Sequence, residues 1–123
     1  MDGEELDDRF RGLPITGLPH GLRLVEARSR RSRRRGLARL ESLPADVALH
    51  IPGTPSVHTF GMRFALDLIW LRRDGTVARI DRNVRSGRIA VCVKARSVVE
   101  TRAGAADRFI AAGIGAGSAP RPS

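Results

Sequence analysis

The sequence is short of the residues that would give it a covalent or membrane anchor. It contains one cysteine, Cys92, so no internal disulfide can form and no disulfide-linked partner is expected. No apolar run approaches the roughly 18 residues of a membrane span. Three of the first five residues are acidic, whereas a secretory signal would be basic and then apolar. These absences predict a cytoplasmic, bacterial-type protein.

Aromatic residues and lysines are also scarce. Aromatics make up 4% of the chain, with no tyrosine and one tryptophan, so a core would rest on Leu, Ile, Val and Ala. Hydrophobic residues make up 41% of 123 residues, which favours one packed domain over a disordered chain. Lysine occurs once, at Lys94, among 22 basic residues, and this preference for arginine is typical of a high-GC genome.

Acidic residues are outnumbered by basic ones, and they are unevenly placed. The 22 basic and 13 acidic residues give a net charge of +9. Five of the acids lie within the first eight residues, so residues 9–123 carry 22 basic against 8 acidic residues, or +14. A body with this charge is expected to make non-specific contacts with polyanions.

Short apolar or alternating runs dominate what is present, and they predict strands. The clearest hairpin signal is Asp74-Gly75, which separates the strongest apolar run of the chain from a second β-rich run. In all, alternation and β-branched content predict strands at residues 22–26, 47–51, 57–62, 65–71, 76–80, 89–93 and 96–101.

Two helices and two flexible ends complete the prediction. Ser29 is a suitable N-cap for a helix over residues 30–40, and residues 103–112 are typical of a second short helix. Residues 1–20 show no sustained period and are predicted to be a flexible arm, with residues 116–123 as a flexible tail. Residues 21–115 would then form one α+β domain, with a mostly antiparallel sheet that is curled or barrel-like.

Several short motifs follow one another in a characteristic order. They are Arg35-Gly36-Leu37, Leu43-Pro44, Phe60-Gly61-Met62, residues 66–71, residues 74–77, Asn83, residues 98–100 and residues 103–108. Their order and spacing resemble the domain-of-unknown-function family 192 (DUF192) of small prokaryotic proteins, from about residue 22 to residue 115. The resemblance implies a compact β-rich domain with one or two helices, and it implies no reaction.

The chain departs from the DUF192 pattern at two places. Ala65 stands where the pattern has a proline before the Leu-Asp pair. The Gly-Asp pair that the resemblance places after the last helix is replaced by Gly115-Ala116-Gly117, so an acidic residue is missing there.

An arginine-rich segment, residues 28–39 with seven arginines, is a candidate polyanion site. Such a helix could neutralise phosphates of a nucleic acid or a lipid headgroup. The alternative is a solvated helix face, because the arginines point to several sides of the axis and no aromatic lies between them. The candidate binding residues are Arg30, Arg31, Arg33, Arg34 and Arg35.

A second candidate site surrounds an acidic residue on an apolar strand. Alternation places Asp67 on the face of Ile69 and Leu71, where an unpaired carboxylate is costly. A partner is therefore predicted: His58, Arg63 or a backbone N–H at a turn. The functional interpretation is a polar pocket in which Asp67 orients His58 as an acid or base. The structural one is a buried pair that fixes the register of the sheet.

Other chemistry has little support in the sequence. The histidines His20, His50 and His58 and the single cysteine lack close ligand spacing, so neither a metal site nor a cofactor is predicted. Cys92 lies in an apolar strand, where a free cysteine acts as a small hydrophobe.

These observations leave three functional hypotheses. The leading one is a non-enzymatic binding or accessory module with a pocket around His58, Arg63 and Asp67. The second is polyanion binding through residues 28–39, assisted by Arg72 and Arg73. The third is a small hydrolase or transferase that uses His58, although no nucleophile accompanies that histidine in the sequence.

Overall fold

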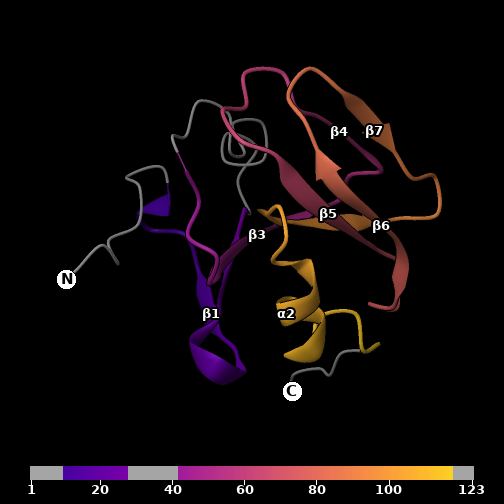
Figure 1. Ribbon diagram of the computed structural model, residues 1–123. Helices are drawn as coiled ribbons and strands as arrows, with labels where there is room; N and C mark the ends of the chain where they lie inside the picture. The colour runs from indigo at the N-terminus through magenta and orange to yellow at the C-terminus, as the bar shows by residue number, and fades with distance from the viewer. Residues whose placement is uncertain (1–9, 28–41, 118–123) are drawn as a thin grey trace.

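The computed structural model describes residues 10–27 and 42–117 (Figure 1). Its elements are eight strands, one short 3-10 helix and one short α-helix. In chain order they are β1 (Ile15–Gly17), η2 (Pro19–Gly21), β2 (Arg23–Glu26), β3 (Val47–Pro52), β4 (Ser56–His58), β5 (Leu66–Leu71), β6 (Val77–Val84), β7 (Ile89–Val91), β8 (Ser97–Arg102) and α2 (Ala106–Ala111).

Six of the strands form one sheet in the order β1-β2-β3-β8-β5-β6. All neighbours pair antiparallel except β2 and β3, so the prediction of a mostly antiparallel sheet is confirmed. Strands β4 and β7 pair with each other in a separate two-stranded ribbon. Within the described residues the large sheet has two edges, β1 and β6, and it does not close into the expected barrel-like form.

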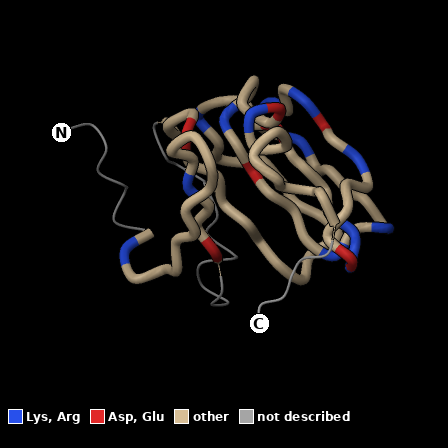
Figure 2. Tube along the Cα trace, turned by 90° about the horizontal axis from the view of Figure 1, so that it is seen from below, with Lys and Arg blue, Asp and Glu red and all other residues tan. Residues whose placement is uncertain are grey.

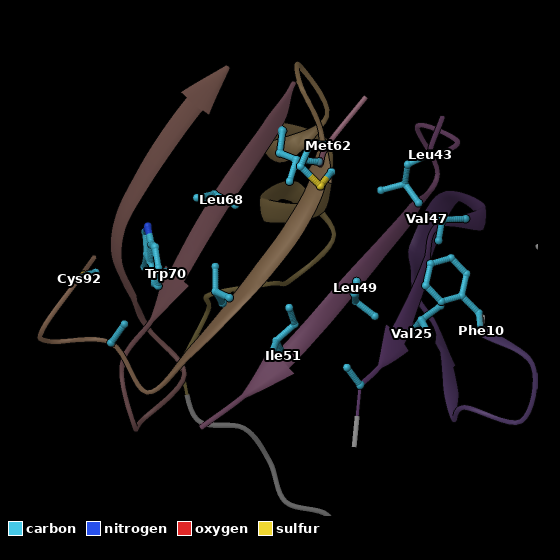
Figure 3. Packing of buried hydrophobic residues seen from close by; sticks show 14 residues of the cluster. Phe10, Val25, Leu43, Val47, Leu49, Ile51, Met62, Leu68, Trp70 and Cys92 are labelled. Atoms are coloured by element: carbon cyan, nitrogen blue, oxygen red, sulfur yellow. The ribbon is translucent and has the colours of Figure 1, made fainter. Parts of the chain in front are cut away.

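Each face of the large sheet carries its own apolar cluster, because successive side chains of a strand point to opposite faces. One cluster contains Leu68 and Trp70 of β5 with Leu49 and Ile51 of β3 (Figure 3), and Val57 and Ala90 of the β4–β7 ribbon pack against it. The other contains Ile69, Val99 and the α2 residue Phe109. The ribbon and α2 therefore cover opposite faces.

The predicted hairpin at Asp74-Gly75 is confirmed between β5 and β6. Gly75 has φ of +84°, a conformation that glycine adopts without strain, and the Arg72 N–H donates to the carbonyl of Thr76 at 2.8 Å. Behind the turn, the fully buried Trp70 donates its indole N–H to Asp81 on the partner strand at 3.0 Å. That bond satisfies the only polar atom of the largest core side chain.

The ends of the domain differ from the prediction. Part of the predicted arm belongs to the fold: β1 pairs with β2, and Phe10 is 3% exposed in the core. The sequence hides this strand because its three residues are all exposed and so show no alternation. The helix predicted over residues 103–112 is confirmed as α2, in shorter form. The helix predicted over residues 30–40 lies outside the described residues. Among those residues, no helix is long and apolar enough to cross a membrane.

Candidate functional site

Asp67 lies on β5 at the face that α2 covers. It shares this face with Ile69 and Leu71, and it is 2% exposed. The predicted burial of its carboxylate is therefore confirmed. A carboxylate in this position is costly unless hydrogen-bond donors surround it, so the partners decide what the residue does.

The partners of Asp67 are three backbone N–H groups. Oδ1 accepts the N–H of Asn83 at 2.9 Å, and Oδ2 accepts the N–H groups of Gly104 at 2.9 Å and Ala106 at 3.2 Å. Hydrogen bonds to a charged acceptor are stronger than neutral ones. The sequence predicted His58, Arg63 or a backbone N–H as the partner of Asp67. In the structure the partners are backbone N–H groups.

The first donor comes from a β-bulge in β6. Leu66 pairs with Val84 and Leu68 with Asp81, so Asp67 faces two residues of β6 instead of one. The extra residue leaves the ladder, and Asn83 takes a left-handed conformation with φ of 54°. Asn is one of the few non-glycine residues that tolerate this region. The bulge turns the Asn83 N–H away from the ladder, and Asp67 receives it.

The other two donors come from the turn that joins β8 to α2. Ala105 is the N-cap of α2 and has no side chain that could accept a hydrogen bond. The first N–H groups of a helix lack partners within the helix. Asp67 of β5 is the partner of one of them, the N–H of Ala106, and so it acts as the missing cap. One carboxylate thereby joins β5, β6 and the start of α2.

An open recess of about 370 Å³ lies over this junction. Its lining consists of Asp67, Arg82, Asn83, Ala103 and Gly104. Arg82, Asn83 and Gly104 are exposed, whereas Asp67 forms the buried floor. An added Cβ at Gly104 would meet no atom within 4 Å, which shows how open the recess is at this side.

An ion pair holds the arginine at the mouth of the recess. Arg82 donates from two nitrogens to Asp107 of α2, at 2.9 and 3.2 Å. The bonds to Asp107 raise the pKa of Arg82 above its usual value. Two of the five guanidinium N–H groups serve this pair, and three remain to bind an acceptor. Asp107 thus orients the guanidinium and leaves N–H donors for a ligand.

The structure does not bring His58 to this recess. His58 lies on β4 of the ribbon, which covers the sheet face opposite α2, and it is exposed. Its ring stacks on Phe60 with the centroids 5.3 Å apart. Arg63 is exposed in the connection between β4 and β5. The residues that join Asp67 at the recess are Arg82 and Asn83, of which the sequence marked only Asn83, as part of the family pattern.

Other predicted residues are placed as follows. Arg30, Arg31, Arg33, Arg34 and Arg35 lie outside the described residues, while Arg72 and Arg73 are exposed on the β5–β6 turn. Cys92 is buried, as its apolar strand predicted. In residues 10–27 and 42–117, no group of three or more His, Cys, Asp or Glu side chains could hold a metal ion.

A second buried carboxyl group, Glu100 of β8, was missed as a site residue. It is 5% exposed and lies between Leu49 of β3 and Leu68 of β5, on the face away from α2. No described residue donates a hydrogen bond to it, and burial raises its pKa from 4.5 to about 7. Strand alternation places Glu100 with the core residue Val98, so the signal was present in the sequence.

A histidine–carboxylate pair was also missed. Nδ1 of His50 on β3 lies 2.8 Å from Oε1 of Glu26 on β2, and both side chains are about one-fifth exposed. The two residues are directly opposite each other in the parallel pair of strands. Parallel pairing between segments 24 residues apart cannot be read from local alternation, which explains why the sequence did not reveal the pair.

The fold and the recess define the protein class: a small, single-domain, mostly β protein in which a buried carboxylate forms the floor of an open recess. The chain belongs to the family DUF192, described as an uncharacterized ACR, whose model matches residues 14–118. The resemblance seen in the sequence motifs is thereby confirmed over most of the chain. No curated protein matches the chain.

Two solved structures have a similar fold. One is from Sinorhizobium meliloti 1021 and is described provisionally as a transcription regulator; it has a TM-score of 0.64, 20% identity, and coverage of 82% of this chain and 86% of that one. The other, a protein of unknown function from Novosphingobium aromaticivorans DSM 12444, has a TM-score of 0.63, 17% identity, and coverage of 87% and 93%. At these identities the likeness shows the fold alone.

Proposed function

We propose that the protein is a non-enzymatic binding or accessory module and that its ligand occupies the recess above Asp67. The observation that carries this proposal is that the recess has a hydrogen-bonded floor and polar side chains at its mouth. The oxygens of Asp67 are engaged by three backbone N–H groups, while Arg82 and Asn83 present polar groups at the mouth. Such a site binds through fixed hydrogen-bonding groups on a preformed surface.

The chemistry of the lining argues for binding over catalysis. The described residues that line the recess include no serine, cysteine, histidine or lysine. The one carboxylate among them, Asp67, already accepts backbone N–H groups at both oxygens, which argues against its use as a nucleophile or general base. The third hypothesis, a hydrolase or transferase that uses His58, would need a separate site on the ribbon. If His58 has that role, His58→Ala will abolish an activity that the wild type shows in a hydrolase screen.

The charges around the recess indicate the ligand class. Arg82 offers three N–H donors, and the Asn83 amide offers a donor and an acceptor. One guanidinium stands beside two carboxylates, Asp67 and Asp107, so a strongly anionic ligand would meet an unfavourable field. The site therefore suits a small neutral or zwitterionic molecule that carries a carbonyl or carboxylate oxygen for Arg82.

A thermal-shift screen of small polar compounds, followed by calorimetry, tests this function. Arg82→Gln removes the guanidinium, and Asn83→Gly removes the amide without straining the left-handed backbone. We expect both variants to lose binding of a compound that stabilises the wild type. Arg108→Gln, which removes an exposed arginine of α2 outside the recess lining, is the matched control and should bind normally. Equal binding by all four proteins would rule out the recess as the site.

A second candidate function is polyanion binding, favoured by the net charge of +9. Figure 2 shows Lys and Arg positions along much of the described trace, with fewer Asp and Glu positions between them. The described surface available to it includes Arg72 and Arg73, and the arginines of residues 28–39 would add to it. Binding of this kind loses affinity steeply as salt rises, because counterions are released. A titration with duplex and single-stranded DNA that shows no salt dependence would eliminate it.

A further inference from the structure

The large hydrophobic side chains that remain exposed gather on the ribbon. Four of the five in the described chain belong to the ribbon and its turns: Phe60, Ile89, Val91 and Val93. The fifth, Ile15, lies on the edge strand β1. Ile89 is 69% exposed and Val93 is 84% exposed. Isolated exposed hydrophobic residues are common, but a group of them on one element indicates a contact surface.

The pairing of the ribbon explains why these side chains face outward. Val57 pairs with Ala90, and both pack against the core beneath the ribbon. The flanking positions, Ile89 and Val91, therefore point to the opposite side, away from the core. A shift of one residue in the register would bury them and expose Val57 and Ala90. The exposed apolar face is thus built into the register of the ribbon.

A buried threonine holds one end of the ribbon rigid. The Thr59 hydroxyl donates to the carbonyl of Arg85 at 2.7 Å and accepts the N–H of Arg88 at 2.8 Å, and the Thr59 N–H donates to the carbonyl of Arg88 at 2.8 Å. Thr59 is 1% exposed. These bonds lock the turn before β7 onto the turn that carries Phe60. A partner would therefore meet a preorganised surface and bind without ordering it first.

The ribbon and its turns themselves carry charge of one sign. Residues 53–65 and 85–96, which form the ribbon and its turns, contain five basic residues and no acidic ones. All five are exposed, and three of them, Arg85, Arg88 and Lys94, lie on the turns at the two ends of β7. Arg88 and Lys94 adjoin Ile89 and Val93 in the chain. We call the four exposed hydrophobic residues and these three cations the ribbon patch.

We propose that the ribbon patch docks on an anionic lipid surface. The apolar side chains would insert among the headgroups, and the three cations would contact the lipid phosphates. A second copy of this chain is a poor partner, because it would bring another all-basic patch against the first. A single-stranded nucleic acid would satisfy the cations, but successive bases need several rings on which to stack. The patch has one aromatic member, Phe60, whose ring already stacks on His58, and its other three apolar members are aliphatic.

Sedimentation with lipid vesicles tests this docking surface. We expect the full chain to bind vesicles that contain about a quarter phosphatidylglycerol and not to bind vesicles of pure phosphatidylcholine. The variant Arg88→Gln/Lys94→Gln should lower the partition coefficient about 25-fold, at roughly five-fold per charge. The variant Ile89→Ser/Val93→Ser should lower it at least about ten-fold. Ile15→Ser and Arg108→Gln remove equivalent groups elsewhere and should bind as the wild type does.

Three results would overturn the proposal. Equal binding to both kinds of vesicle would remove the role of charge, and binding that survives Ile89→Ser/Val93→Ser would leave only electrostatic attraction. The third is that both double variants weaken binding of a single-stranded oligonucleotide and leave binding of vesicles unchanged. The partner would then be a nucleic acid. As a positive readout, the added tryptophan of Val93→Trp should shift its emission to the blue on anionic vesicles; an unshifted emission contradicts insertion.

Discussion

Two carboxyl groups lie buried on opposite faces of the same sheet, and their surroundings differ. Asp67 on β5 accepts three backbone N–H groups, whereas Glu100 on the neighbouring strand β8 accepts none from the described residues. Both are at most 5% exposed. Burial alone therefore does not determine what a buried acid does. Donors make Asp67 a structural junction, and their absence makes Glu100 a source of instability when it is ionised.

The largest effect is expected from Asp67→Ala. The substitution leaves three N–H groups without an acceptor, and orphaned buried donors cost roughly 1–3 kcal/mol each. Some will gain water, so we expect the free energy of unfolding to fall by about 4 kcal/mol in urea titrations. Asp74→Ala is the matched control, because Asp74 accepts two hydrogen bonds from Thr76 in an exposed turn. Its loss should be much smaller, and equal losses would remove the special role of Asp67.

The next effect concerns the other carboxyl group and depends on pH. Burial raises the pKa of Glu100 from 4.5 to about 7, so the folded state favours its protonated form. The stability contributed by this group is full below pH 4.5 and is lost as pH rises through about 7. The difference is on the order of 3 kcal/mol. Glu100→Gln should thus stabilise the protein at pH 8 and flatten this slope; a variant that keeps the wild-type slope would contradict the assignment.

A smaller effect is expected at the bulge that supplies the first donor to Asp67. Asn83 has φ of 54°, where alanine pays a steric cost of about 1–2 kcal/mol and glycine pays none. We expect Asn83→Ala to lower the melting temperature by several degrees and Asn83→Gly to leave it nearly unchanged. Equal melting temperatures for the two variants would show that the left-handed backbone conformation at residue 83 does not determine the effect of the substitution.

The smallest effect is expected at the mouth of the recess. Arg82 and Asp107 form an exposed ion pair, and such pairs contribute little to stability. Arg82→Gln should therefore leave the melting temperature unchanged while it abolishes ligand binding. A clear drop in melting temperature would show that Arg82 supports the fold, and the contrast between floor and mouth of the recess would disappear.

Much of the fold could be predicted from local patterns. The Asp74-Gly75 hairpin, the central strands and the helix α2 follow from alternation and turn chemistry over a few residues. The edge strand β1 could not be predicted, because its three exposed residues give no periodic signal and its pairing is made by backbone groups. The parallel pairing of β2 with β3 could not be predicted either, because its register depends on where the rest of the sheet places each strand.

The site was predicted in part. Alternation placed Asp67 in an apolar environment and required a partner, and both expectations are confirmed. The donors come from residues 16, 37 and 39 positions away along the chain, and two of them depend on a bulge and a helix start. No spacing rule connects such positions. For this reason the sequence pointed to His58 and Arg63, whereas the structure places Arg82 and Asn83 beside Asp67.

The rate of amide hydrogen exchange at Asn83 and Gly104 tests the central claim most directly. Both residues are exposed, so their N–H groups would exchange rapidly if Asp67 did not accept them. We predict slow exchange in the wild type and a marked acceleration in Asp67→Asn, relative to the N–H of Val99 at the centre of the sheet. Rapid exchange at both sites in the wild type would show that Asp67 does not hold this junction together.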